Sequence, residues 1–164
     1  MMTNVFNTTF ELSLRVLLTL DSSNNSPRTV DIITALDFIT VYGKDFGISD
    51  ENLHGDNSYR FCELAVRREL ITGALKSLVL DGLVSVQASE KGFTYEINSK
   101  GKIFCNEMES TYAKEYRKAA VTAQAFVSRN KQKDVLKIIN QQSLLALQRG
   151  ESNGCFLYGK AEKI

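Results

Sequence analysis

The 164-residue chain has little of what metal and redox chemistry requires: one histidine, three cysteines and no tryptophan. A single histidine excludes the usual histidine-rich zinc and iron sites. The cysteines, at positions 62, 105 and 155, are odd in number and widely spaced, which suits neither a disulfide framework nor a zinc site. We expect Cys62 and Cys105 to be small core residues, and we expect no cofactor.

The chain also lacks the segments that direct a protein to a membrane. It has no run of about 20 apolar residues, and its first four residues lack the basic and apolar regions of a signal peptide. We therefore expect a cytoplasmic protein without a membrane partner.

The sequence contains no complete catalytic motif. It has neither a P-loop nor a G-x-S-x-G nucleophile motif, and Asp45-Phe46-Gly47 stands without the other kinase signatures. A hydrolase would have to rely on His54 alone, in a polar loop. We expect no enzymatic activity, and any ATP would be hydrolysed by another subunit.

Charge is distributed unevenly, although the formal net charge is only +1. Residues 1–113 carry 10 basic and 15 acidic side chains, a balance of −5, and residues 114–164 carry 10 basic and 4 acidic, a balance of +6. Opposite poles of this kind can orient a protein within a larger assembly.

Apolar periodicity predicts a mainly helical α+β fold. Helices are expected from Thr8 or Thr9 to about residue 20, over 30–41, within 59–81, from Asn98 or Ser99 toward Phe126, and over 131–148. Gly82 should end the third helix, and alternating residues in 83–87 and 93–97 predict a β-hairpin. We interpret residues 1–113 as a winged-helix domain, 114–150 as a basic helical extension packed on it, and 151–164 as a weakly ordered tail.

Several short runs occur in the order seen in one family. They are Phe10-Glu11-Leu12-Ser13-Leu14-Arg15, Ala35-Leu36-Asp37-Phe38, Leu53-His54, Arg60, Glu63, Arg67-Arg68-Glu69-Leu70, Gly82-Leu83-Val84 and Glu109-Ser110-Thr111-Tyr112-Ala113. With this order and spacing, the chain resembles the middle component of bacterial ABC-three-component systems, the small subunit of Lamassu-type defence operons.

The resemblance implies a non-catalytic subunit. It would link an SMC- or Rad50-like ATPase to an effector such as a nuclease, in response to foreign DNA. The subunit would transmit changes in the ATPase or restrain the effector, and DNA would be met through the complex.

The charged run in the third helix has two interpretations. Glu63 and Arg67 could form an ordinary i,i+4 pair on a solvated face. Alternatively, the arginines could make bidentate contacts with a partner's carboxylates. The resemblance favours a buried network or an interface, and the candidate partner-contact residues are His54, Arg60, Glu63, Arg67 and Arg68.

A second basic set begins near residue 114. It comprises Lys114, Arg117, Lys118, Arg129, Lys131, Lys133 and Lys137. These residues are candidates for phosphate or DNA contact, although a plain solvated face is an equally good interpretation.

The main alternative is a free-standing winged-helix transcription regulator. The helix from about Arg68 to Asp81 would then enter the major groove. Residues 59–82 carry four basic and three acidic residues, so this region offers little phosphate neutralisation.

Overall fold

The computed structural model describes residues 8–56 and 59–150, which form six α-helices and one three-stranded sheet. The fold is α+β and mainly helical, as predicted. The elements, in chain order, are α1 (Thr9–Asp21), β1 (Arg28–Thr29), α2 (Val30–Val41), the 3₁₀ turns η2 (Gly43–Phe46) and η3 (Arg60–Cys62), α3 (Glu63–Leu80), β2 (Val84–Ser89), β3 (Gly92–Ile97), α4 (Ser99–Asn106), α5 (Thr111–Ser128) and α6 (Gln132–Gln148).

Polar side chains fix where four of the helices begin. The hydroxyl of Thr8 accepts a hydrogen bond from the Glu11 amide, and Thr29 does the same for Ile32. Asn98 caps α4 and Ser110 caps α5 in the same manner. Such caps satisfy backbone donors that the helix itself leaves unpaired.

The sheet is antiparallel with strand order β1-β3-β2. Gly82 follows α3 with φ of 74°, a left-handed conformation that turns the chain into β2, as predicted. The hairpin pairs Val84 with Ile97 and Ser89 with Gly92, which confirms the predicted strands with shifts at their ends. β1 was not predicted, because two residues are too few to show periodicity.

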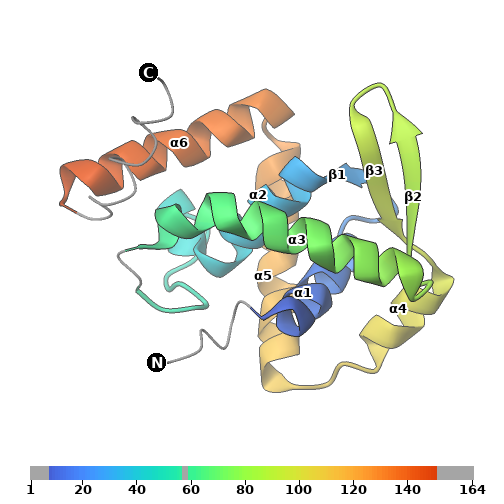
Figure 1. The fold of residues 1–164 in the computed structure, drawn as a ribbon. Coiled ribbons are helices and arrows are strands. Elements are labelled where there is room, and N and C mark those ends of the chain that lie inside the picture. The colour runs from blue at the N-terminus through green and yellow to red at the C-terminus, as the bar shows by residue number, and fades with distance from the viewer. Residues whose placement is uncertain (1–7, 57–58, 151–164) are drawn as a thin grey trace.

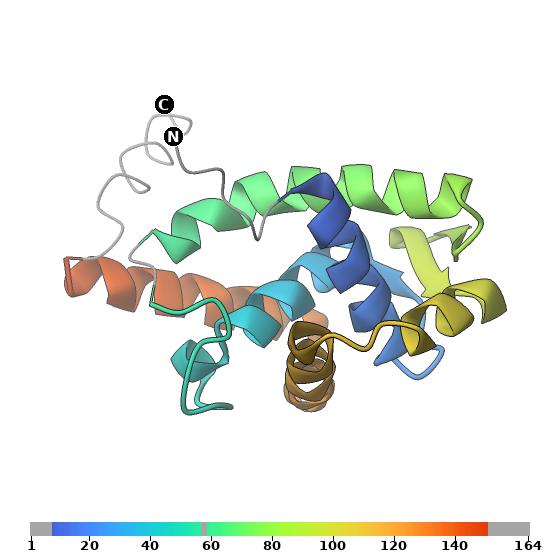
Figure 2. The same ribbon diagram turned by 90° about the horizontal axis from the view of Figure 1, so that it is seen from below.

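α1, α2, α3 and α5 enclose the core (Figures 1 and 2). Figure 1 shows α5 crossing behind α1 and α2, and α6 extending away from the hairpin. Tyr116, Ala120 and Ala123 on the inner side of α5 are at most 1% exposed. α5 therefore completes the core, and it crosses the predicted domain boundary at residue 113. The division into 1–113 and 114–150 stays a prediction, and 151–164 lie outside the described residues.

Two expectations are wrong. The helix predicted from Asn98 toward Phe126 is interrupted between Asn106 and Thr111, because Ser110 adopts an extended conformation and caps a new helix. Cys105 is buried and free, but Cys62 is only partly buried, so it is not the core residue that was expected.

Candidate functional site

A buried ion pair joins the first two helices. Arg15 of α1 donates from Nε to Oδ1 of Asp37 on α2 at 2.8 Å, and from a terminal nitrogen to the other carboxylate oxygen. The two residues are 1% and 0% exposed. Arg15 also donates to Glu11 Oε2 at 2.9 Å, one turn earlier in α1. This geometry uses the planar fork of arginine to hold two helices in register.

Asp37 collects contacts from two further helices. Tyr116 of α5 donates to its Oδ1 at 2.7 Å, and the Tyr116 hydroxyl also lies 2.8 Å from the hydroxyl of Thr19. Arg67 of α3 places Nη1 at 3.5 Å from Asp37 Oδ2. One carboxylate thus connects α1, α2, α3 and α5, and we call Arg15, Asp37, Arg67 and Tyr116 the buried network.

The neighbouring arginines determine the ionisation of Asp37. Burial by itself would raise the pKa of this carboxyl, but the charges of Arg15 and Arg67 and the hydrogen bonds outweigh it and hold the pKa well below its usual range. Burial likewise raises the pKa of Glu11 to about 7 against the opposing charge of Arg15. Asp37 is therefore ionised at neutral pH, whereas Glu11, which contacts the network through Arg15, titrates near neutrality.

Arg67 points into the fold and Arg68 out of it. Arg67 is 2% exposed, lies 3.3 Å from Glu63 Oε2, and stacks over Phe38 and Tyr42 at 5.4 and 5.7 Å. The pair of Glu63 and Arg67 therefore joins the buried network to a partly exposed carboxylate and is not a solvated pair. Arg68, whose side chain is 51% exposed, donates to Asp31 at 2.6 Å.

Arg60 is also turned inward. It makes a bidentate contact with Asp45 of η2, with Nε and Nη2 at 2.6 and 2.9 Å from the carboxylate oxygens. Both side chains are about nine-tenths buried, at 8% and 11% exposure. This pair fastens the loop after α2 to the start of α3, so Arg60 performs a structural task in the isolated chain.

His54 packs against α5. Its Nε2 lies 2.6 Å from the hydroxyl of Tyr112, and its ring stacks on that of Tyr112. Burial, together with the positive charge of Arg15, lowers the pKa of His54 to about 3. The imidazole is therefore neutral near pH 7. Of the five predicted partner-contact residues, only Arg68 is exposed, and their role in binding stays a prediction.

The predicted basic set separates into two groups. Lys114, Arg117 and Lys118 lie in the first half of α5, where Arg117 is half-buried and donates to the Cys105 carbonyl at 2.7 Å. Arg129, Lys131, Lys133 and Lys137 follow around the junction of α5 and α6 and are all exposed. About 18 Å of helix separates Arg117 from Arg129. The two groups are not one continuous face, and phosphate contact by either stays a prediction.

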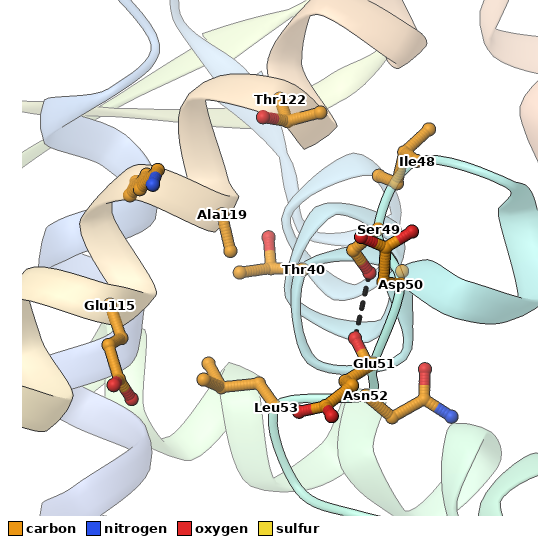
Figure 3. Close-up of a pocket in the computed structure, with 12 residues that line it drawn as sticks. Thr40, Ile48, Ser49, Asp50, Glu51, Asn52, Leu53, Glu115, Ala119 and Thr122 are labelled. Carbon is orange, nitrogen blue, oxygen red and sulfur yellow. Dashed lines mark hydrogen bonds between the residues drawn. The ribbon is translucent and has the colours of Figure 1, made fainter.

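A cleft of about 650 Å³ lies between α5 and the loop that follows α2 (Figure 3). Thr40 of α2 lies at its centre, residues 48–53 form one wall, and Glu115, Ala119 and Thr122 of α5 lie opposite. Lys118 also lines the cleft. This predicted phosphate residue therefore lines the same cleft as three acidic residues, Asp50, Glu51 and Glu115.

The described part of the chain offers no obvious place for a metal or a membrane. Residues 8–56 and 59–150 contain no group of three histidine, cysteine or acidic side chains that could hold a metal ion. None of the helices in these ranges has the length and hydrophobicity needed to span a bilayer.

Sequence reasoning missed three members of the buried network: Arg15, Asp37 and Tyr116. A signal was present for two of them, because Arg15 and Asp37 each stand alone within a dense apolar run. A charge at a core-facing helical position calls for a buried partner. Tyr116, 79 residues from Asp37, carries no comparable signal.

Comparison with known proteins gives one informative result. No curated protein and no solved structure matches the chain. A family model described as ABC-three component (ABC-3C) system Middle Component 2 matches residues 5–149. This range includes the buried network, the cleft and every predicted site residue. The chain belongs to the ABC-three component system Middle Component 2 family.

Proposed function

We propose that this protein is the non-catalytic linking subunit of its three-component system, joining an SMC- or Rad50-like ATPase to an effector such as a nuclease in a Lamassu-type defence complex. Membership of the middle-component family is the observation that carries the proposal. Foreign DNA would act on the ATPase, and this subunit would transmit the change or restrain the effector.

The state of the reactive side chains supports a non-catalytic role. The only histidine has a pKa of about 3, so it is a poor proton acceptor near neutrality. Burial raises the pKa of Cys105 to about 12, which keeps the thiol protonated and a weak nucleophile. Asp37 is held in ion pairs within the core.

The architecture supports a role as a rigid connector. The element order from α1 to β3 and the sheet order β1-β3-β2 are those expected of a winged helix with its wing. The buried network ties this unit to α5. A body braced in this way can carry a change in orientation from one partner to the other without being deformed.

The same architecture invites the alternative of a DNA-binding regulator, which the charges of α3 disfavour. Its exposed charged side chains are Arg68, Glu69 and Lys76, and Arg68 already pairs with Asp31. Phosphate neutralisation supplies much of DNA affinity, so this helix would bind DNA weakly. Protein contact is the better use of such a surface.

Any DNA contact would involve the junction of α5 and α6. Arg129, Lys131, Lys133 and Lys137 fall within nine residues, together with a single acidic residue, Asp134. None of the four forms an ion pair in the described ranges. We assign this group, in preference to α3, the contact with phosphate.

Co-expression with the adjacent operon genes tests the proposal. A tag on this chain should retain the large ATPase through gel filtration, at a mass that fits a defined complex. A Lys76→Ala variant removes an exposed cation of α3 and tests whether this helix contacts DNA, because it should abolish DNA binding only if the regulator alternative holds. Recovery of this chain alone, as a folded monomer or dimer, together with a sequence-specific footprint that Lys76→Ala abolishes, would instead support the regulator.

A further inference from the structure

The cleft between α5 and residues 48–53 has a fixed shape. The Ile48 amide donates to the Gly43 carbonyl at 3.1 Å, and the Lys44 amide donates to Asn52 Oδ1 at 3.0 Å. A Cβ atom at Gly43 would lie only 2.6 Å from the Ser49 hydroxyl, so the loop folds back closely on the end of α2. Sites that exist before binding avoid the entropic cost of ordering a loop.

The carboxylates of the cleft are available to a ligand. Asp50, Glu51 and Glu115 are exposed, and none of them forms an ion pair within the described residues. Lys118 is the only cation of the lining, which leaves an excess of two negative charges. Between these groups, Ile48 and Leu53 pack against the core and Ala119 presents a small apolar side chain. The cleft thus combines an acidic rim with an apolar floor.

These features fit a polypeptide better than a small molecule. Small-molecule sites are usually enclosed by mainly hydrophobic and aromatic side chains. Here no aromatic residue lines the space, and the hydroxyl-bearing residues Thr40, Ser49 and Thr122 line it together with the acids (Figure 3). Protein interfaces typically have such a mixture of polar rim and apolar centre.

We propose that this cleft receives a basic segment of a partner subunit, with a lysine or arginine at the acidic rim and a small apolar side chain on the floor. The inference rests on the proposed function, because it requires a partner protein. Charge complementarity decides the chemistry of that partner: Asp50, Glu51 and Glu115 attract cations and repel nucleic-acid phosphates.

The test uses the purified complex and a steric plug. Thr122→Trp would fill the cleft from the exposed surface of α5, and Val121→Trp, which adds the same ring to a neighbouring side chain that is 59% exposed and outside the cleft, is the matched control. We expect Thr122→Trp to weaken the complex at least 10-fold and Val121→Trp to leave it unchanged. Equal effects of the two variants, or no effect of the plug, would overturn the inference.

A zero-length carbodiimide crosslink identifies the contact independently of affinity. In the wild-type complex, Glu115, Glu51 or Asp50 should be joined to a partner lysine, and Glu115→Gln should remove the crosslink at that position. If the complex forms but only acids outside the cleft are crosslinked, the inference fails while the linking role stands. If no complex forms, both fail.

Discussion

Arg15 and Asp37, which are 22 residues apart, form a bidentate ion pair that is almost completely buried. Their helices meet in the core, where an unpaired charge would be strongly unfavourable. Arg67 and Tyr116 approach the same carboxylate from α3 and α5. The arrangement makes one aspartate the point at which four helices are held together.

Replacing that aspartate should be severely destabilising. Asp37→Asn removes the charge that compensates Arg15 and Arg67, and breaking a buried pair in this way costs about 3 to 5 kcal/mol. The free energy of unfolding, measured by urea denaturation, should fall by this amount. The control is Asp31→Asn, which breaks the exposed pair with Arg68 and should cost under about 1 kcal/mol. Equal losses would contradict the structure.

The hydroxyl of Tyr116, and not only its ring, should contribute to the stability of the fold. Tyr116→Phe keeps the packing of the ring but leaves Asp37 without one donor and Thr19 without its partner. We expect a loss of about 1 to 3 kcal/mol in unfolding free energy. Tyr95→Phe, at a half-buried site in β3, should change stability by less than about 0.5 kcal/mol. A neutral Tyr116→Phe would show that the hydrogen bond to Asp37 is absent.

His54 should make stability depend on acid pH. Because its folded pKa is lowered to about 3 from an ordinary 6.5, its contribution is complete above pH 6.5 and is lost as the pH falls toward 3. The slope should reach up to about 1.4 kcal/mol per pH unit. Unfolding free energies of the wild type and of His54→Gln, measured between pH 4 and 6.5, should therefore diverge, with the wild type showing the steeper rise.

Glu11 should make stability depend on pH in the opposite direction to His54. Its folded pKa is raised to about 7, so its contribution is present below its ordinary pKa of 4.5 and is lost as the pH rises through 7. Comparing wild type with His54→Gln cancels this effect, because Glu11 is unchanged in both. Parallel profiles for the two proteins would contradict the burial of a neutral imidazole.

The adjacent arginines Arg67 and Arg68 should respond differently to truncation. Arg67→Ala removes a fully buried side chain and leaves Asp37 with one fewer cation, so we expect a loss of at least about 3 kcal/mol. Arg68→Ala should cost under about 1 kcal/mol, since its pair with Asp31 is exposed. Thermal unfolding of both variants checks this. A reversed order would place Arg67 at the surface.

The basic group at the α5–α6 junction should affect the salt dependence of DNA binding by the complex. Replacing Lys131, Lys133 and Lys137 with glutamine should reduce the slope of log affinity against log salt by up to about 2.7, at about 0.9 for each phosphate contact. Replacing Lys114 and Lys118 is the comparison, because Lys118 lines a cleft together with three acidic residues. An unchanged slope in the junction variant would exclude phosphate contact there.

The sequence predicted the elements well where local signals agree. α2 begins and ends at the predicted residues because Thr29 caps it and a continuous apolar run follows. The break before α5 was missed because residues 103–126 keep a helical apolar pattern across Ser110, and only the backbone conformation of that cap reveals the interruption.

The site was harder to predict because its contacts are distant in sequence. His54 and Tyr112 are 58 residues apart, and Arg60 and Asp45 lie on opposite sides of a loop. Residue spacing could identify Arg67 as a charged residue in an apolar helix, yet it could not determine whether the side chain faces inward. Lys118 was assigned to a basic face because the acidic wall formed by residues 50 and 51 is adjacent only in space.

The most direct test of the linking role is native mass spectrometry of the ATPase and the effector, co-expressed with and without this chain. We expect one complex that contains all three proteins when the chain is present, and separate ATPase and effector when it is omitted. A stable assembly of ATPase and effector that forms equally well without this chain would contradict the linking role.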